Sequence, residues 1–264
     1  MTKFAGPAEL YPDVAAIGSL AAALQAVAAE RGLELGQVVA NEKQPLHNAL
    51  IMSATPRRES LGVNAGAAER CWTISGWGQG ISLVSGTSRD LAEVARAAQL
   101  WREGVALREI ERSVPFVELT RLALAAELGP EQVVATQWHS LLDDARPASW
   151  PEHVQLVEAA YAEPKLRQLY PYTSHWTLRF STTTGFPFSP DVITLEARKG
   201  KPYLVRKTWM GDELGETATA QEAVALAVRL LPDGLGPAVA GRYRLCSGPG
   251  SSSTRNPLAP GQAG

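Results

Sequence analysis

The stretch HWTLRFSTTT, residues 175–184, alternates two kinds of side chain along its length. Apolar Trp176, Leu178 and Phe180 stand between polar residues such as Arg179. This period of two is typical of an antiparallel strand that buries one face and leaves the other polar. The stretch therefore predicts a one-sided sheet with helices packed on its apolar face.

Further strand candidates extend this sheet and form a second one. Asp191 to Arg198 and Tyr203 to Trp209 follow the first strand and are joined by the turn RKGK. Upstream, short apolar runs are bounded by the turn sequences TPRR, GAAE and GWGQG. Their bounds are about Leu46 to Ala54, Ser60 to Ala65, Arg70 to Gly76 and Gly80 to Val84. We therefore expect two small antiparallel sheets, at about Leu46 to Val84 and His175 to Trp209.

Helical periodicity flanks both sheets. Val14 to Arg31 carries one apolar stripe, and a second amphipathic helix begins at Thr87 or Ser88. The sequence TAQE at 219–222 is a capping box that opens a last helix, which stops at Pro232. Each sheet is thus expected to pack helices on one face.

A helical segment joins the two strand regions. From about Gly104 to Glu163 the pattern is helical throughout, and Pro130 and Pro151 suit first helical positions. The fold class predicted is α+β. Its parts are an N-terminal α+β module at 11–103, a helical connecting segment at 104–163, a C-terminal α+β module at 164–241 and a tail at 242–264, disordered because Gly, Ser and Pro cannot build a core.

The two modules share short stretches of sequence. ALIMSATP at 49–56 resembles TLRFSTTT at 177–184, and GTSRDLAEVARAAQL at 86–100 resembles GETATAQEAVALAVRLL at 215–231. The order suggests duplicated α-β-β-β-α modules. Chance similarity between common residues is the alternative.

Composition excludes several classes of partner. The formal net charge of −2 and 20% charged residues give no large field of either sign, so we expect neither nucleic-acid nor membrane binding. Cys71 and Cys246 cannot form a disulfide framework, which fits a cytoplasmic protein. The N-terminal sequence lacks the long apolar run of a signal or anchor.

No motif indicates a cofactor or a metal. GWGQG at 76–80 is followed by a strand candidate, whereas a phosphate loop needs a helix behind it, so a hairpin with Trp77 at its tip is expected. The four histidines are scattered without metal-ligand spacing. They are His47, His139, His153 and His175.

The segment between Arg167 and Pro190 carries the candidate site. Ser174, His175 and Arg179 form its catalytic set, because a histidine can transfer protons near pH 7 and an arginine can hold an anion. Its binding set is Tyr170, Tyr172, Trp176, Phe186 and Phe188. The alternative is that the turn is structural and Arg179 pairs across strands with Glu196. A groove beside Trp72 and Trp77 is the next candidate.

Four stretches resemble a known family. They are YPDVAAIGSLAAALQAVAAERGL, GPEQVVATQW, LVEAAYAEPKLRQLYPYTSHWTLRFSTTTGFPFSPDV and AVALAVRLLPDGLGPAVAG. Together they are similar to an uncharacterised actinobacterial family that carries the label "natural product biosynthesis protein", over about Tyr11 to Gly241. The resemblance implies a role in a biosynthetic pathway, in particular for a ribosomally made, modified peptide such as a lanthipeptide.

Two functions are compatible with these observations. In the first, the chain is an accessory protein that binds a precursor peptide or a modifying enzyme of the same pathway. In the second, it is a cofactor-independent tailoring enzyme of the lyase or cyclase type, with His175 as acid or base. A structural or immunity-like protein is a third possibility.

Overall fold

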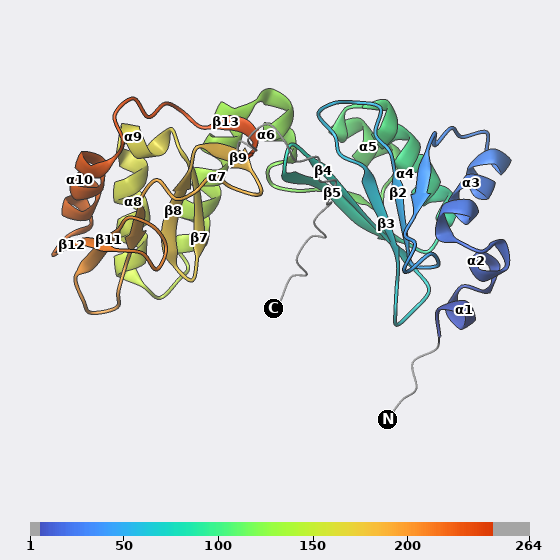
Figure 1. Ribbon diagram of the computed structural model, residues 1–264, viewed down its shortest axis with the longest axis horizontal. Helices are drawn as coiled ribbons and strands as arrows, with labels where there is room; N and C mark the ends of the chain where they lie inside the picture. Colours follow the sequence, from blue (N-terminus) through green and yellow to red (C-terminus); the bar gives the residue numbers. More distant parts are fainter. Residues whose placement is uncertain (1–5, 245–264) are drawn as a thin grey trace, which may run out of the picture.

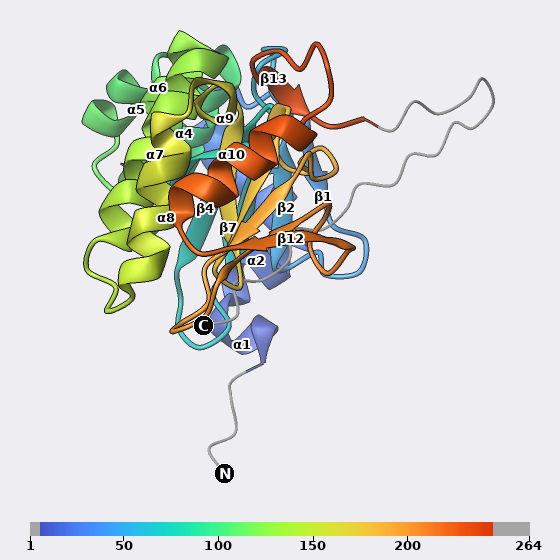
Figure 2. The same ribbon diagram turned by 90° about the vertical axis from the view of Figure 1, so that its left-hand side faces the viewer.

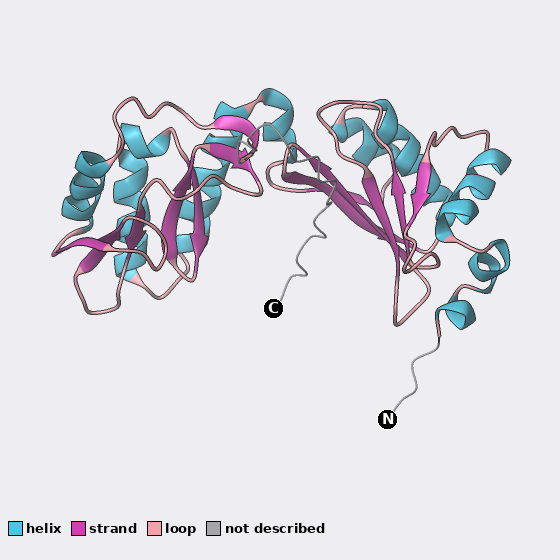
Figure 3. Ribbon diagram, viewed as in Figure 1, coloured by secondary structure: helices cyan, strands magenta, loops and turns pink. Residues whose placement is uncertain are grey.

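Two α+β modules follow one another along the chain, as the fold class predicted. The computed structural model describes residues 6–244 (Figure 1). The predicted disorder at 245–264 lies outside the described residues. Figure 3 separates the two sheets, one in each half of the molecule.

The N-terminal sheet is an antiparallel meander. Its strands, in spatial and chain order, are β1 (Val38–Ala40), β2 (Asn48–Ile51), β3 (Leu61–Ala65), β4 (Trp72–Gly78), β5 (Ile81–Ser88) and β6 (Val117–Leu119). Alternate residues of β4 are buried, the pattern of a sheet covered on one side. The turn between β4 and β5 is Gln79-Gly80, with both φ angles positive, so Trp77 lies within the strand and not at the tip.

The helices of this module differ from the sequence pattern in two respects. The helices that contact strands of the sheet are α3 (Leu20–Glu30), α4 (Leu91–Glu103) and α5 (Leu107–Ser113), and α3 is preceded by α1 (Pro7–Leu10) and α2 (Pro12–Ile17). The single helix expected from Val14 to Arg31 is broken at Gly18, whose φ is 101°, and Ser19 caps α3. The second helix starts after Asp90, whose carboxylate caps it, because Thr87 and Ser88 still belong to β5.

The connecting segment is not helical throughout. Strand β6 interrupts it and adds to the edge of the N-terminal sheet beside β5. Its helices are α5 (Leu107–Ser113), α6 (Ala123–Leu128), α7 (Pro130–Ala145) and α8 (Pro151–Ala162), and α9 (Pro164–Arg167) follows it directly. Pro130 and Pro151 occupy first helical positions as predicted. Helix α6 contacts β5, whereas α7 and α8 pack on the C-terminal sheet, so the segment is shared between the modules.

The C-terminal sheet is also an antiparallel meander. Its order is β12 (Glu213–Thr217), β11 (Tyr203–Arg206), β10 (Thr194–Glu196), β8 (Thr177–Ser181) and β7 (Tyr170–Ser174), and α10 (Ala220–Leu230) follows it. Figure 2 shows α10 in front of the strands. Strand β7 contains Pro171, which an edge strand tolerates. The capping box of Thr219 and Glu222 is present.

The two faces of this sheet have different surroundings. On one face Phe180 packs on Trp138 of α7 and Tyr203 bonds Gln155 of α8, so we call it the helix face. Tyr172 and Arg179 lie opposite each other in register on the other side, which we call the open face. Loops 182–191 and 207–212 adjoin the open face.

A backbone joint connects the modules. Strand β9 (Thr183–Gly185) pairs in parallel with β13 (Val239–Arg242), and the Phe186 amide donates to the Gly80 carbonyl at 2.9 Å. Glu59 accepts from the Gly80 amide at 3.0 Å and pairs with Arg242. The predicted start of the tail at residue 242 is therefore wrong, because Arg242 ends β13 and pairs with Glu59 of the other module.

The internal similarity coincides with topology. The matching stretches at 49–56 and 177–184 include β2 and β8, each the second strand of its sheet. The matching helices α4 and α10 each follow the fifth strand of the meander. In each module five strands of the meander thus lie between two helices along the chain, instead of the three strands expected.

Candidate functional site

The tip of the β7–β8 hairpin sends two neighbouring side chains to opposite sides of the sheet. His175 and Trp176 form its two-residue turn, with φ angles of 51° and 66°. Positive φ at both positions is the type I′ geometry that matches strand twist. The His175 ring stacks on Trp209, 5.3 Å between centroids, whereas Trp176 meets His153 edge-on at 5.4 Å. Trp176 is therefore a turn residue, not the buried strand residue that alternation predicted.

A continuous row of planar groups crosses the open face. Consecutive members lie 4.5 to 5.9 Å apart, either between ring centroids or between the guanidinium carbon and a ring centroid. From the joint to the hairpin tip, this aromatic row consists of Phe186, Phe188, Tyr172, Arg179, Trp209 and His175. The guanidinium of Arg179 lies between two rings, at 4.9 Å from Tyr172 and 5.4 Å from Trp209. The row joins residues of β7 and β8 to both adjoining loops.

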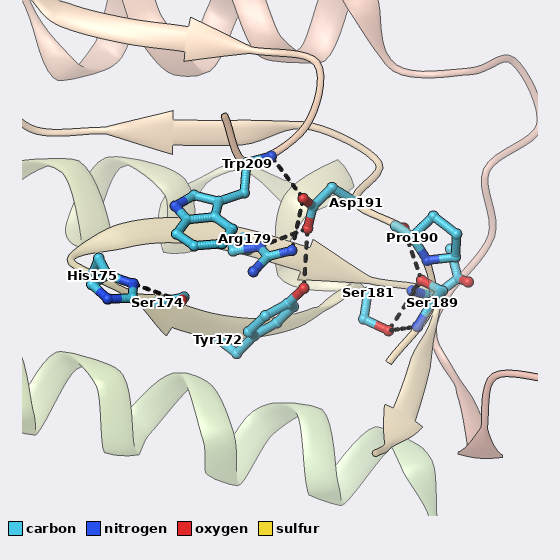
Figure 4. A network of polar contacts seen from close by, with 10 residues as sticks. Tyr172, Ser174, His175, Arg179, Ser181, Ser189, Pro190, Asp191 and Trp209 are labelled. Carbon is cyan, nitrogen blue, oxygen red and sulfur yellow. Dashed lines mark hydrogen bonds and ion pairs between the residues drawn. The ribbon is translucent and has the colours of Figure 1, made fainter. Parts of the chain in front are cut away.

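One carboxylate holds the centre of the row. Asp191, whose side chain is 3% exposed, accepts from Arg179 Nε at 2.8 Å and from Nη2 at 2.9 Å. It also accepts from the Tyr172 hydroxyl at 3.0 Å and from the Trp209 amide at 2.9 Å (Figure 4). Charge-assisted, bidentate bonds of this kind fix orientation as well as adding energy. Asp191 therefore sets the positions of three members of the row.

This arrangement changes what Arg179 can do. Its expected cross-strand partner Glu196 instead lies 3.7 Å from Arg206, and Arg179 pairs with Asp191. Because Asp191 occupies Nε and Nη2, the bidentate fork proposed for an external anion is already engaged. Arg179 acts in this geometry as a flat cationic spacer between Tyr172 and Trp209.

The two tyrosines of β7 are supports of different kinds. Burial, and then the negative charge of Asp191, raise the pKa of Tyr172, so its hydroxyl stays a donor to that carboxylate. Burial raises the pKa of Tyr170 to about 12, and its ring packs on Phe188 at 5.2 Å. Tyr170 is therefore a buried residue that packs against Phe188 of the row.

Buried hydroxyl groups tie down the loop that carries Phe186 and Phe188. Ser181 Oγ donates to the Thr183 carbonyl at 2.7 Å and accepts from the Ser189 amide at 3.1 Å. Ser189 Oγ accepts from the Thr182 amide at 2.8 Å. These bonds leave Phe188 half-buried and Phe186 half-exposed at the end of the row.

Ser174 and His175 remain close at the tip. Ser174 Oγ lies 3.3 Å from His175 Nδ1, and the imidazole is exposed (Figure 4). The catalytic set predicted from sequence is thus brought to one hairpin, with Arg179 two residue pairs further along the strands than Ser174.

The next candidate was a groove beside Trp72 and Trp77, of which Trp72 belongs to the core and Trp77 is partly exposed. Trp72 is 1% exposed and packs on Tyr11, with the Arg70 guanidinium 4.9 Å from its ring. Across residues 6–244, no cluster of His, Cys, Asp or Glu side chains is arranged to hold a metal ion. No helix in the same residues has the length and apolar character needed to cross a membrane.

Sequence reasoning missed the residues that organise this surface. Asp191 and Trp209 stand at the ends of expected strands, where nothing distinguishes them from ordinary strand termini. The contact of Trp176 with Trp150 and His153 was not predicted either. Only the paired strands bring these side chains together.

The comparison with protein families points to the same half of the chain. Residues 132–242 match a family of unknown function, DUF6193. The match runs from the first turn of α7 to the end of β13, less than half of the chain, and includes the whole aromatic row. No curated protein and no solved structure matches the chain.

Proposed function

We propose that this chain is a cytoplasmic accessory protein of a natural-product pathway, in which it binds an extended segment of a precursor peptide or of a modifying enzyme. The aromatic row is the binding surface. The observation that carries the proposal is the contiguity of the row, which runs from the joint to the hairpin tip and is locked by Asp191. The pathway itself, for a modified peptide such as a lanthipeptide, is supported by the family resemblance of the sequence.

The exposed ends of the row suit contact with a polypeptide. Phe186 is 50% exposed and Trp209 is 38% exposed, and the His175 ring stacks on the latter. Aromatic residues supply large contact areas, and a surface that is ordered before binding loses little entropy on association. An elongated, rigid row therefore favours an extended segment over a compact ligand.

The direct test is selection of random peptides displayed on phage against the full chain. We expect peptides rich in apolar residues to be enriched, and their binding to weaken about tenfold or more in Trp209→Ala and Phe186→Ala. Met210→Ala, at an exposed neighbour outside the row, is the matched control and should bind as the native chain does. Peptides that bind equally to all three variants would refute the row as the binding surface.

A second function is favoured by the Ser174–His175 contact. An imidazole hydrogen-bonded to a hydroxyl can transfer protons in a lyase or cyclase reaction without a cofactor. Mass spectrometry of a precursor peptide modified with and without the chain separates the two functions. In a tailoring enzyme His175→Ala abolishes product at any protein concentration, whereas in an accessory protein excess variant restores it.

A further inference from the structure

A sheet edge lies directly beside the aromatic row. Strand β7 ends the C-terminal sheet, and within residues 6–244 the strand that it pairs with is β8 alone. Figure 1 shows β7 on the side of this sheet that is turned toward the N-terminal module. Tyr172, a member of the row, belongs to β7. The row and the edge of the sheet thus adjoin each other.

The hairpin register decides which backbone groups of β7 point outward. Ser174 and Thr177 close a two-residue hairpin, so they exchange both of their backbone hydrogen bonds. Hydrogen-bonded pairs alternate along an antiparallel ladder, so Tyr172 also bonds β8, whereas Pro171 and Thr173 do not. The backbone groups of Pro171 and Thr173 therefore point outward, away from β8.

The outward groups form an alternating set of acceptors and one donor. In the part of the chain that the structure describes, no other backbone group bonds the Thr173 amide or the carbonyls of Pro171 and Thr173. Thr173 is exposed, and Pro171 has no N–H to leave without a partner. In order along the edge stand the Pro171 carbonyl, the Thr173 N–H and the Thr173 carbonyl. Another extended backbone complements this pattern.

The side chains of β7 leave its edge largely unguarded. The sequence of the strand, YPYTS, carries no charge. The opposite edge strand, β12, carries Glu213 and Glu216, both exposed, and charged residues on an edge strand discourage pairing. Pro171 removes one donor from the edge of β7, but the neighbouring Thr173 can still make two bonds. Of the two edges of this sheet, β7 is therefore the one suited to accept a strand.

We propose that the extended segment bound by this chain adds to β7 as a sixth strand of the C-terminal sheet. The inference rests on the proposed function and specifies how the partner meets the row. A residue opposite Tyr172 sends its side chain to the open face, since facing Cβ atoms of paired strands lie about 5 Å apart on the same side. Every second side chain of the segment therefore lies on the side of the row, while its backbone bonds Thr173. The partner is a strand-forming segment with apolar residues at alternate positions.

The probe is the tightest-binding peptide selected on phage against the full chain. Hydrogen exchange of the ¹⁵N-labelled chain is followed amide by amide, with and without this peptide. We expect exchange of the Thr173 amide to slow by about tenfold or more because it gains a partner, whereas the Tyr172 amide is bonded to β8 in both states. N-methylation scanned along the peptide should weaken binding about tenfold at alternate residues only, since every second N–H points to β7. Failure to select any peptide would overturn the proposed function and this inference together.

Substitutions at Thr173 complete the test. Thr173→Pro removes the outward N–H and keeps the bonds of β7 to β8, as Pro171 already does, and should weaken peptide binding about tenfold. Thr173→Ala changes the side chain but keeps the N–H, so it should retain the binding that the proline variant loses.

The outcomes separate this inference from the proposed function. If Trp209→Ala weakens binding and Thr173→Pro does not, the row binds without strand addition, and this inference falls while the proposed function stands. Unchanged exchange of the Thr173 amide in the complex, or equal effects of N-methylation at neighbouring residues, would also overturn it. Sedimentation of the free chain tests the other occupant of an edge, because a dimer that Thr173→Pro abolishes would assign β7 to a second copy.

Discussion

The two modules share a topology but place their aromatic residues differently. In the N-terminal module Trp72 and Trp101 are buried in the core, and the Trp101 indole donates to the Glu59 carbonyl at 2.9 Å. In the C-terminal module Trp176 and Trp209 stand on the surface. The same arrangement of strands and helices thus buries Trp72 and Trp101 in one half and leaves Trp176 and Trp209 on the surface in the other. The family match covers the half that displays them.

The joint between the modules gives the largest expected effect. A Cβ atom on Gly185 would lie within van der Waals overlap of the Gln79 carbonyl oxygen, so Gly185→Val must separate two backbones. We expect a loss of about 3 kcal/mol or more of unfolding free energy, with the modules unfolding in separate steps. Chemical denaturation measures the unfolding free energy, and calorimetry shows whether the modules unfold in separate steps. Gly236→Ala, where a Cβ meets open space, is the control. If Gly185→Val is as stable as the native chain, the backbones of the two modules are not in close contact at the joint.

The Asp191 network gives the next effect. Asp191→Asn leaves the Arg179 guanidinium, with 20% of its side chain exposed, without its charged partner. Breaking a buried pair from one side costs about 3 kcal/mol. Glu213→Gln removes the exposed partner of Arg206 and should cost below about 1 kcal/mol. Equal costs in urea unfolding would show that Asp191 does not hold the row.

The helices that close the two meanders offer a symmetrical test. Asp90 caps α4 and Thr219 caps α10, each through a bond to the first turn. Replacing either residue with alanine should cost about 1 kcal/mol, the usual value of an N-cap. A much larger cost in one module, measured by urea unfolding, would show that the modules are not equivalent in construction.

His153 makes the stability of the C-terminal module sensitive to acid. Burial lowers the pKa of His153 below its ordinary value of 6.5. The unfolded chain therefore takes up a proton below about pH 6.5 while the folded chain does not, so stability is lost as the pH falls. Each pKa unit corresponds to about 1.4 kcal/mol. His153→Gln should flatten the fall in melting temperature between pH 7 and 5.5, and an unchanged slope would contradict this account.

Local sequence patterns predicted individual helices and strands better than they predicted which elements pack together. The strand predicted at 177–181, the capping box at Thr219 and the prolines at Pro130 and Pro151 each act within one element, and each was confirmed. The expected alternation of burial in that strand was wrong, because Thr177 and Ser181 are buried along with Leu178 and Phe180. Short edge strands such as β1, β6 and β12 escaped because three to five residues carry little periodicity.

Only part of the site was predicted, because sequence patterns act within one continuous segment. His175, Arg179 and the aromatic residues of 170–188 belong to one continuous segment and were identified together. Asp191 and Trp209 join them through strand pairing and loop closure, which depend on contacts remote in sequence. His175 and Trp176 point to opposite sides of the sheet because both have positive φ angles. The sequence does not predict these angles, since neither position holds glycine or asparagine.

Hydrogen–deuterium exchange of the full chain, with and without a peptide selected on it, tests the central claim most directly. We expect added protection at residues 170–175 and 186–210, which carry the aromatic row, and unchanged exchange in the N-terminal sheet at 38–119. Protection confined to the N-terminal sheet would contradict the proposal that the C-terminal module carries the binding surface.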